Sequence, residues 1–183
     1  IPQLPNGVRA IPTSLKIAIK SLILTKILKK LRLKKDSYNT MLINTANTVA
    51  VHNEIISQVN NYRQDLVDRV RSYDESLETE FKLIYDEYIN NQIEFNRICK
   101  FNDKKIFKKL DSWDLVKSQL RDSIEKVIAI QLSGNHKHQL KDVKYKQQSL
   151  IIIGSLRLSR GLVIPELSIS YFLRNSGQYD SLL

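Results

Sequence analysis

The chain has 183 residues, of which 42% are apolar, and it carries 29 Lys or Arg against 19 Asp or Glu. This length is sufficient for one hydrophobic core and too short to require two, so we expect a single domain with appendages. The only cysteine, Cys99, excludes an internal disulfide, and lysines interrupt every run that approaches the about 18 apolar residues of a membrane-spanning helix. We therefore expect an intracellular protein, without distinction between cytoplasm, nucleus and mitochondrial interior.

Almost the whole net charge of +10 lies in the first 35 residues, which contain nine Lys or Arg and no Asp or Glu. The rest of the chain is nearly balanced, so the charge marks one segment and not the whole protein. Such a segment is the place where an anionic surface would be bound. The expected anion-binding residues are Arg9, Lys16, Lys20, Lys26, Lys29, Lys30, Arg32, Lys34 and Lys35.

The distribution of Gly and Pro predicts an all-α fold. From Thr13 to Ser133 the chain has 121 residues without either type, although average usage would place roughly 14 there. Turns between strands need these residues, so their absence favours helices over a β-sandwich or barrel. Residues 1–12 hold three prolines and an Asn-Gly pair, and we expect them to form an extended arm.

The helical part divides into a basic apolar helix over 13–35 and a long helical hairpin over 36–134. We expect the hairpin to consist of a helix over 38–100, with a kink near 44–48, and an antiparallel partner over 103–133. The link between them at Asn102-Asp103 is short and polar, which is typical of antiparallel neighbours. The predicted architecture is an elongated helical bundle.

An eleven-residue repeat of apolar side chains follows the expected helix over 38–100. Eleven residues per three turns is about 3.67 residues per turn, so the stripe stays nearly straight along its partner. We interpret it as the buried face of a bundle helix, with Trp113 as an anchor from the partner helix; an intermolecular coiled coil is the alternative. The expected helix–helix interface is Val59, Tyr62, Leu66, Val70, Tyr73, Leu77, Phe81, Ile84, Tyr88, Phe95 and Trp113.

Residues 135–183 fit two interpretations. Helices over 141–160 and 165–177, ended by Gly161 and Gly177, are favoured because Pro165 suits the first turn of a helix. The alternative is a small β-hairpin within 149–175, because apolar and other residues alternate there.

No catalytic, cofactor-binding or metal site is expected. His136 and His138 are two residues apart, which does not place them on one helical face, and Cys99 falls on the apolar stripe. The segment from Gly154 to Gly161 lacks the Gly-Lys-Ser/Thr ending of a phosphate-binding loop. We therefore expect no small-molecule substrate.

The function predicted is that of a non-catalytic structural or adaptor subunit of a larger assembly, whose partners are other protein subunits. The basic helix is apolar on more than one side, which favours packing between protein elements and docking on an acidic protein surface. The alternative is sequence-independent binding to an RNA or DNA backbone, or to an anionic membrane surface, through residues 9–35. The segment from Glu54 to Lys100 is acidic overall and is the expected internal docking surface.

Overall fold

A computed structural model describes residues 11–34, 38–45, 49–99, 112–131, 148–154 and 164–173. Its elements, in chain order, are α1 (Thr13–Leu33), β1 (Asn39–Asn44), α2 (Val49–Arg71), α3 (Glu75–Cys99), α4 (Trp113–Glu125), β2 (Val127–Gln131), β3 (Ser149–Gly154) and β4 (Leu167–Phe172).

The four strands form one parallel sheet in the order β2-β3-β1-β4, so the expected all-α fold is wrong. The protein is a mixed α/β domain. The scarcity of Gly and Pro was misleading because parallel strands are joined by crossovers of about a dozen or more residues, and not by tight turns. The central strand β3 is buried along its whole length, and the side chains of its apolar run Leu150–Ile153 alternate between the main core and a smaller apolar cluster on the opposite face.

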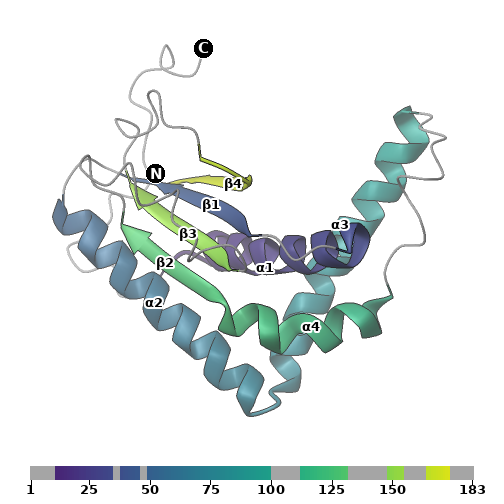
Figure 1. Ribbon diagram of the computed structural model, residues 1–183, viewed down its shortest axis with the longest axis horizontal. Coiled ribbons are helices and arrows are strands. Elements are labelled where there is room, and N and C mark those ends of the chain that lie inside the picture. Colours follow the sequence, from purple (N-terminus) through teal and green to yellow (C-terminus); the bar gives the residue numbers. More distant parts are fainter. Residues whose placement is uncertain are drawn as a thin grey trace.

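Two helices cover one face of the sheet, and two more pack outside or beside them (Figure 1). α1 lies over β1 and β4, and α2 lies over β2 and β3. α4 packs on both of these helices, while α3 packs on α1 and extends away from the sheet. The main core therefore lies between the sheet and α1 and α2, and a smaller apolar cluster around Leu150 and Ile152 occupies the opposite face.

The long helix predicted over 38–100 is interrupted twice. Its first residues form β1, and its middle contains a turn between α2 and α3 at residues 72–74. The coiled-coil prediction is wrong as well, because the two halves of the apolar stripe belong to two helices that meet at an angle (Figure 1). Their buried residues join one core together with α1, α4 and the sheet.

The later part of the chain also differs from the prediction. Of the expected helix over 103–133, residues 103–111 and 132–133 lie outside the described residues, the part from Trp113 to Glu125 is helical, and Val127 already belongs to β2. The favoured helices over 141–160 and 165–177 are contradicted by β3 and β4. The hairpin alternative is wrong too, since β3 and β4 are parallel to β1, which lies between them.

Asn39 joins three elements at the amino-terminal end of the sheet. Its buried amide donates a hydrogen bond to the carbonyl oxygen of Leu22 in α1 at 2.7 Å. The same amide accepts a hydrogen bond from the Ser149 hydroxyl of β3 at 2.8 Å. α1 is thereby placed over β1 and β3 by a polar contact inside an otherwise apolar layer.

We expect Asn39→Ala to lower the free energy of unfolding by about 2 kcal/mol, because the buried Ser149 hydroxyl loses its partner. Urea denaturation measures the change. Asn90→Ala, on the exposed side of α3, serves as the matched control and should change stability by less than about 0.5 kcal/mol. Equal effects of the two substitutions would show that the Asn39 contacts do not hold α1.

Candidate functional site

The basic helix α1 is an interior helix. Its large aliphatic side chains are almost all buried, and only Ile17 and Leu33 are exposed. The buried set is Leu15, Ile19, Leu22, Ile23, Leu24, Ile27 and Leu28. These side chains are the ones that a membrane-surface helix would insert into lipid, and here they contact the sheet and the neighbouring helices instead.

The cations of α1 also contact other elements of the domain. Lys20, only 6% exposed, forms an ion pair of 2.5 Å with Glu80 of α3. Lys29 forms an ion pair with Glu166, and the Lys30 ammonium donates to the Gln119 side chain at 2.9 Å. Lys26 is 3% exposed.

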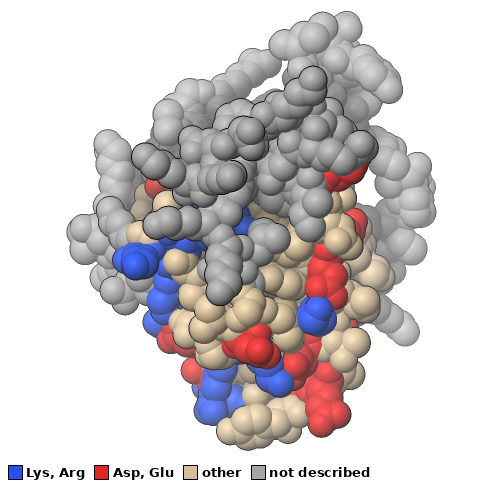
Figure 2. Space-filling view, turned by 90° about the vertical axis from the view of Figure 1, so that its right-hand side faces the viewer, with Lys and Arg blue, Asp and Glu red and all other residues tan. Residues whose placement is uncertain are grey.

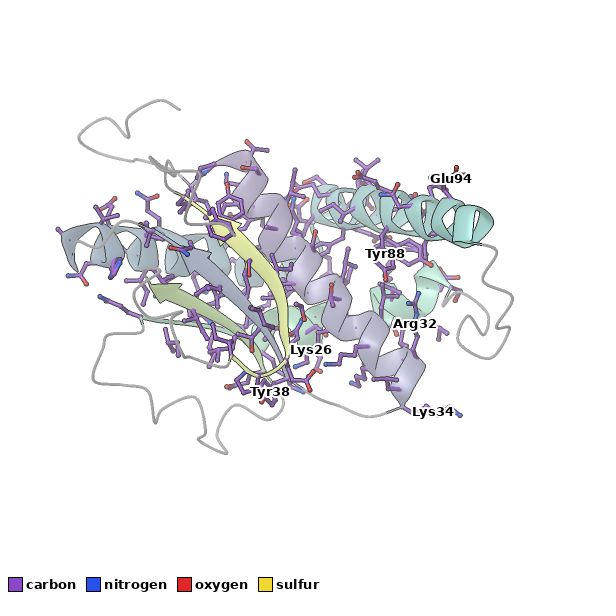
Figure 3. The ribbon with its side chains drawn as sticks, turned by 90° about the horizontal axis from the view of Figure 1, so that it is seen from above. Lys26, Arg32, Lys34, Tyr38, Tyr88 and Glu94 are labelled. Carbon is purple, nitrogen blue, oxygen red and sulfur yellow. The ribbon has the colours of Figure 1, made fainter. Side chains whose placement is uncertain are left out.

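Two further α1 cations lie over aromatic rings of the acidic segment. The Lys16 ammonium is 5.4 Å from the centre of the Tyr62 ring, and the Arg32 guanidinium is 5.9 Å from that of Tyr88. Figure 3 shows Arg32 directed toward Tyr88, whereas Lys34 points away from the end of α1. Arg9 and Lys35 lie outside the described residues. The cations predicted to bind an external anion thus make several contacts within the domain.

The predicted interface residues separate into buried and exposed groups. Val59, Tyr62, Leu66, Leu77 and Phe81 are buried, and Val70, Ile84 and Trp113 are partly buried around them. The Trp113 ring lies 5.3 Å from that of Tyr85, between α4 and α3. Tyr88 is partly exposed, and the side chain of Phe95 lies outside the description. Tyr73 is 80% exposed.

Tyr73 occupies an unusual backbone position in the turn between α2 and α3, which we call the elbow (residues 72–74). Its φ is 58°, in the left-handed region. The Asp74 N–H donates to the Arg69 carbonyl at 3.0 Å and the Tyr73 N–H to the Val70 carbonyl at 3.4 Å. This is the Schellman pattern that ends helices, in which glycine is the usual residue at the left-handed position. A tyrosine there is conformationally unfavourable by about 1 kcal/mol or more.

Arg69 and Asp74 fix the elbow from its inner side. Asp74 begins α3 by accepting a hydrogen bond from the Ser76 N–H at 2.8 Å, and its second oxygen accepts from the Arg69 guanidinium at 2.6 Å. The same guanidinium donates to Glu80 at 2.8 Å, and Glu80 also accepts from Lys20. The network Lys20–Glu80–Arg69–Asp74 therefore connects the buried helix α1 to the elbow.

The network lowers the pKa of both carboxyl groups. Hydrogen bonds from Ser76 and Arg69 lower the pKa of Asp74 well below its usual range. Partial burial opposes ionisation of Glu80, but the hydrogen bonds from Arg69 and Lys20 outweigh it and lower the pKa of that carboxyl too. Both side chains are therefore carboxylates at neutral pH.

A groove of about 400 Å³ lies beside the elbow, between α3 and α4. We call it the elbow groove. Its floor is apolar, and its lining includes Val70, Leu77, Phe81, Leu120 and Ile124, with Tyr73 at the rim. Glu75 and Glu78 line the α3 side, and Lys117 and Arg121 line the α4 side. Glu78 and Lys117 form an ion pair of 2.7 Å between the two helices.

The apolar repeat predicts Tyr73 as an interface residue, but in the middle of a long helix and not in a turn. The polar network and the charged rim of α4 were not predicted. A signal was present, since Asp74 with Ser76 is a helix-start pattern in the middle of the apolar repeat. Lys117 and Arg121 carried no comparable signal, because their position depends on how α4 packs.

The described part of the chain meets the requirements of neither a metal site nor a membrane-spanning helix. No three His, Cys, Asp or Glu residues gather there in a way that suits a metal ion. No helix among the described residues has both the length and the apolar content needed to cross a bilayer.

Taken together, the fold defines a domain with a four-stranded parallel sheet, one face of which is covered by helices. Residues 14–183 match the Z1 domain, and the chain belongs to that family. No curated protein and no solved structure matches the chain.

We expect the network to make stability depend on pH through Arg69. A carboxylate whose pKa is lowered by folding stabilises the protein fully above its unfolded value, about 4, and this contribution is lost as the pH falls through the folded value. Arg69→Met should therefore reduce the free energy of unfolding most at about pH 5 and above, and the difference from wild type should narrow toward about pH 2. Urea denaturation of both proteins at the two pH values measures this difference. Lys34→Met, at the exposed end of α1, is the control. A difference that stays constant with pH would contradict the role assigned to Arg69.

Tyr73→Gly should increase the free energy of unfolding by about 1 kcal/mol, because glycine adopts the left-handed conformation without a steric penalty. Thermal or urea denaturation measures this gain. Tyr73→Ala keeps the Cβ atom and should give no such increase. A loss of stability in Tyr73→Gly would mean that the tyrosine side chain stabilises the elbow.

Proposed function

We propose that this domain is a non-catalytic structural or adaptor unit of a larger intracellular assembly, and that the elbow groove binds an amphipathic helix of another protein subunit. The main observation behind the proposal is that the large aromatic side chain of Tyr73 is 80% exposed at the rim of an apolar groove. Aromatic residues beside desolvated pockets are typical energetic centres of protein interfaces.

The conformation of Tyr73 supports a role in binding and not in folding. Its side chain is solvent-exposed, so it adds little to the core, and its left-handed backbone would be better served by glycine. Residues held in unfavourable conformations occur preferentially at functional sites. A binding role would account for a tyrosine at this position.

The rim charges indicate the chemistry of the partner. The α3 rim is acidic and the α4 rim is basic, so the groove favours a ligand with opposite charges along its two sides. An amphipathic helix with an apolar stripe, basic residues facing α3 and acidic residues facing α4 has this property. A uniformly anionic polymer would meet the repulsion of Glu75 and Glu78.

The alternative, binding of nucleic acid or anionic lipid through residues 9–35, has weaker support. Several cations of α1 already contact Glu80, Glu166, Gln119 or aromatic rings, and their release would break contacts inside the fold. On the face shown in Figure 2, the described residues carry both signs of charge, with uncharged residues between them. These observations favour a protein partner.

The test is to isolate the partner that co-purifies with the protein through nuclease and high-salt washes, and then to measure its affinity for defined variants. Tyr73→Gly should weaken binding at least about tenfold while the domain becomes more stable. The matched control Leu83→Ala, on an exposed position of α3 outside the groove, should bind as the wild type does.

The double exchange Glu78→Lys with Lys117→Glu supplies a second readout. It preserves an ion pair between α3 and α4 but inverts part of the rim, so the fold should persist and binding should weaken. The proposal would be contradicted by a partner whose affinity is unchanged in both groove variants, or by an association that nuclease or moderate salt abolishes.

A further inference from the structure

A second feature lies at the carboxyl ends of the strands, away from the elbow groove. Asn44, the last residue of β1, is 1% exposed, and neither its amide nitrogen nor its amide oxygen has a hydrogen-bond partner in the described structure. Buried amides are nearly always hydrogen-bonded in folded proteins, so an orphaned one requires an explanation.

The backbone of Asn44 and Thr45 takes part in the pairing of the strands. The Asn44 carbonyl accepts a hydrogen bond from the Leu173 N–H at 2.8 Å, and the Thr45 N–H donates to the Gly154 carbonyl at 3.0 Å. The strands therefore remain paired up to their last residues. The side-chain amide of Asn44 is nevertheless left without a partner.

Register places two other residues beside this amide. Asn44 pairs with Gly154 of β3 and with Phe172 of β4. Met41 and Ile43 of β1, like Ile169 and Tyr171 of β4, belong to the core under α1, so by alternation Asn44 and Phe172 lie on the opposite face. Gly154 offers no side chain next to the amide, and Phe172 is 51% exposed.

The order of the strands makes their carboxyl ends a place where ligands are commonly bound in sheets of this type. The chain runs from β1 to β2 at one edge of the sheet, whereas it runs from β3 past β1 to β4 at the other edge. The connections that leave the neighbouring strands β1 and β3 thus lead toward opposite sides of the sheet, which makes the carboxyl ends of these two strands a switch point. Open α/β sheets bind ligands at the carboxyl ends of strands at a switch point of this kind.

We propose that Asn44, Gly154 and Phe172 form a binding site for a nucleobase. A free amide presents a donor beside an acceptor and pairs with a planar ring that offers the complementary edge, as Asn does with adenine. The exposed Phe172 ring provides a face for stacking, which is the second recurrent means of holding a base. The described residues that end the four strands are uncharged, which suits a neutral ring.

Calorimetry and thermal-shift measurements on the whole chain test this proposal, with adenosine, guanosine, cytidine and uridine as probes. At least one nucleoside should bind and raise the melting temperature. Purine riboside, which lacks an exocyclic donor, should bind about tenfold or more weakly than adenosine if adenosine is the best ligand. A short oligoadenylate distinguishes the source of the base: tighter binding than adenosine indicates a single strand, and equal or weaker binding indicates a free nucleoside.

Two variants and one control assign the binding to these residues. Asn44→Leu removes an orphaned amide, so it should fold at least as stably as the wild type but bind at least about tenfold more weakly. Phe172→Ala should bind about fivefold or more weakly through loss of stacking. Leu167→Ala, an exposed position at the other end of β4, should bind normally.

Failure of every nucleoside to bind at millimolar concentration, or equal binding by wild type and Asn44→Leu, would overturn the proposal. The groove variants at Tyr73 should leave nucleoside binding unchanged, so the two proposals fail independently.

Discussion

The burial of α1 is the constraint on which the rest of the structure depends. This helix lies against the sheet on one side and against α3 and α4 on others, and its fully buried side chains each contribute about 1.5–3 kcal/mol by leaving water. A helix in that position cannot carry unpaired charge. Lys20 therefore pairs with Glu80, and through Glu80 and Arg69 the requirement to satisfy one buried cation extends to the elbow between α2 and α3.

Part of this organisation could be predicted from the sequence. The basic helix is apolar on more than one side, which indicated packing between protein elements, and the acidic segment that contains Glu80 was the expected docking surface. The strands were missed because Leu42-Ile43 and Leu150–Ile153 are short apolar runs whose periodicity fits a buried helix as well as a strand. Their pairing depends on residues more than a hundred positions apart, which local patterns do not record.

At the candidate sites, too, some features follow from the local sequence and others depend on how distant parts of the chain pack. Tyr73 stands in the apolar repeat, and this repeat made it an expected interface residue, but its exposure follows from the Schellman turn and from how α4 packs. Asn44 gave no signal, because an asparagine at a strand end is common and only the fold leaves its amide unpartnered. In both places, the residue is less favourable for stability than a simple alternative, glycine or leucine. Residues that are unfavourable for stability in this way are expected mainly at functional sites.

The central claim, that α1 is an interior helix and not a basic arm available to outside partners, is tested most directly by native-state hydrogen exchange. In an interior helix, the backbone amides from Ile19 to Leu28 should exchange only through global unfolding, with the same opening free energy as the amides of β1 and β3. Exchange of the α1 amides at an opening free energy well below that of the sheet would contradict it, because the helix would then leave the domain while the sheet remains folded.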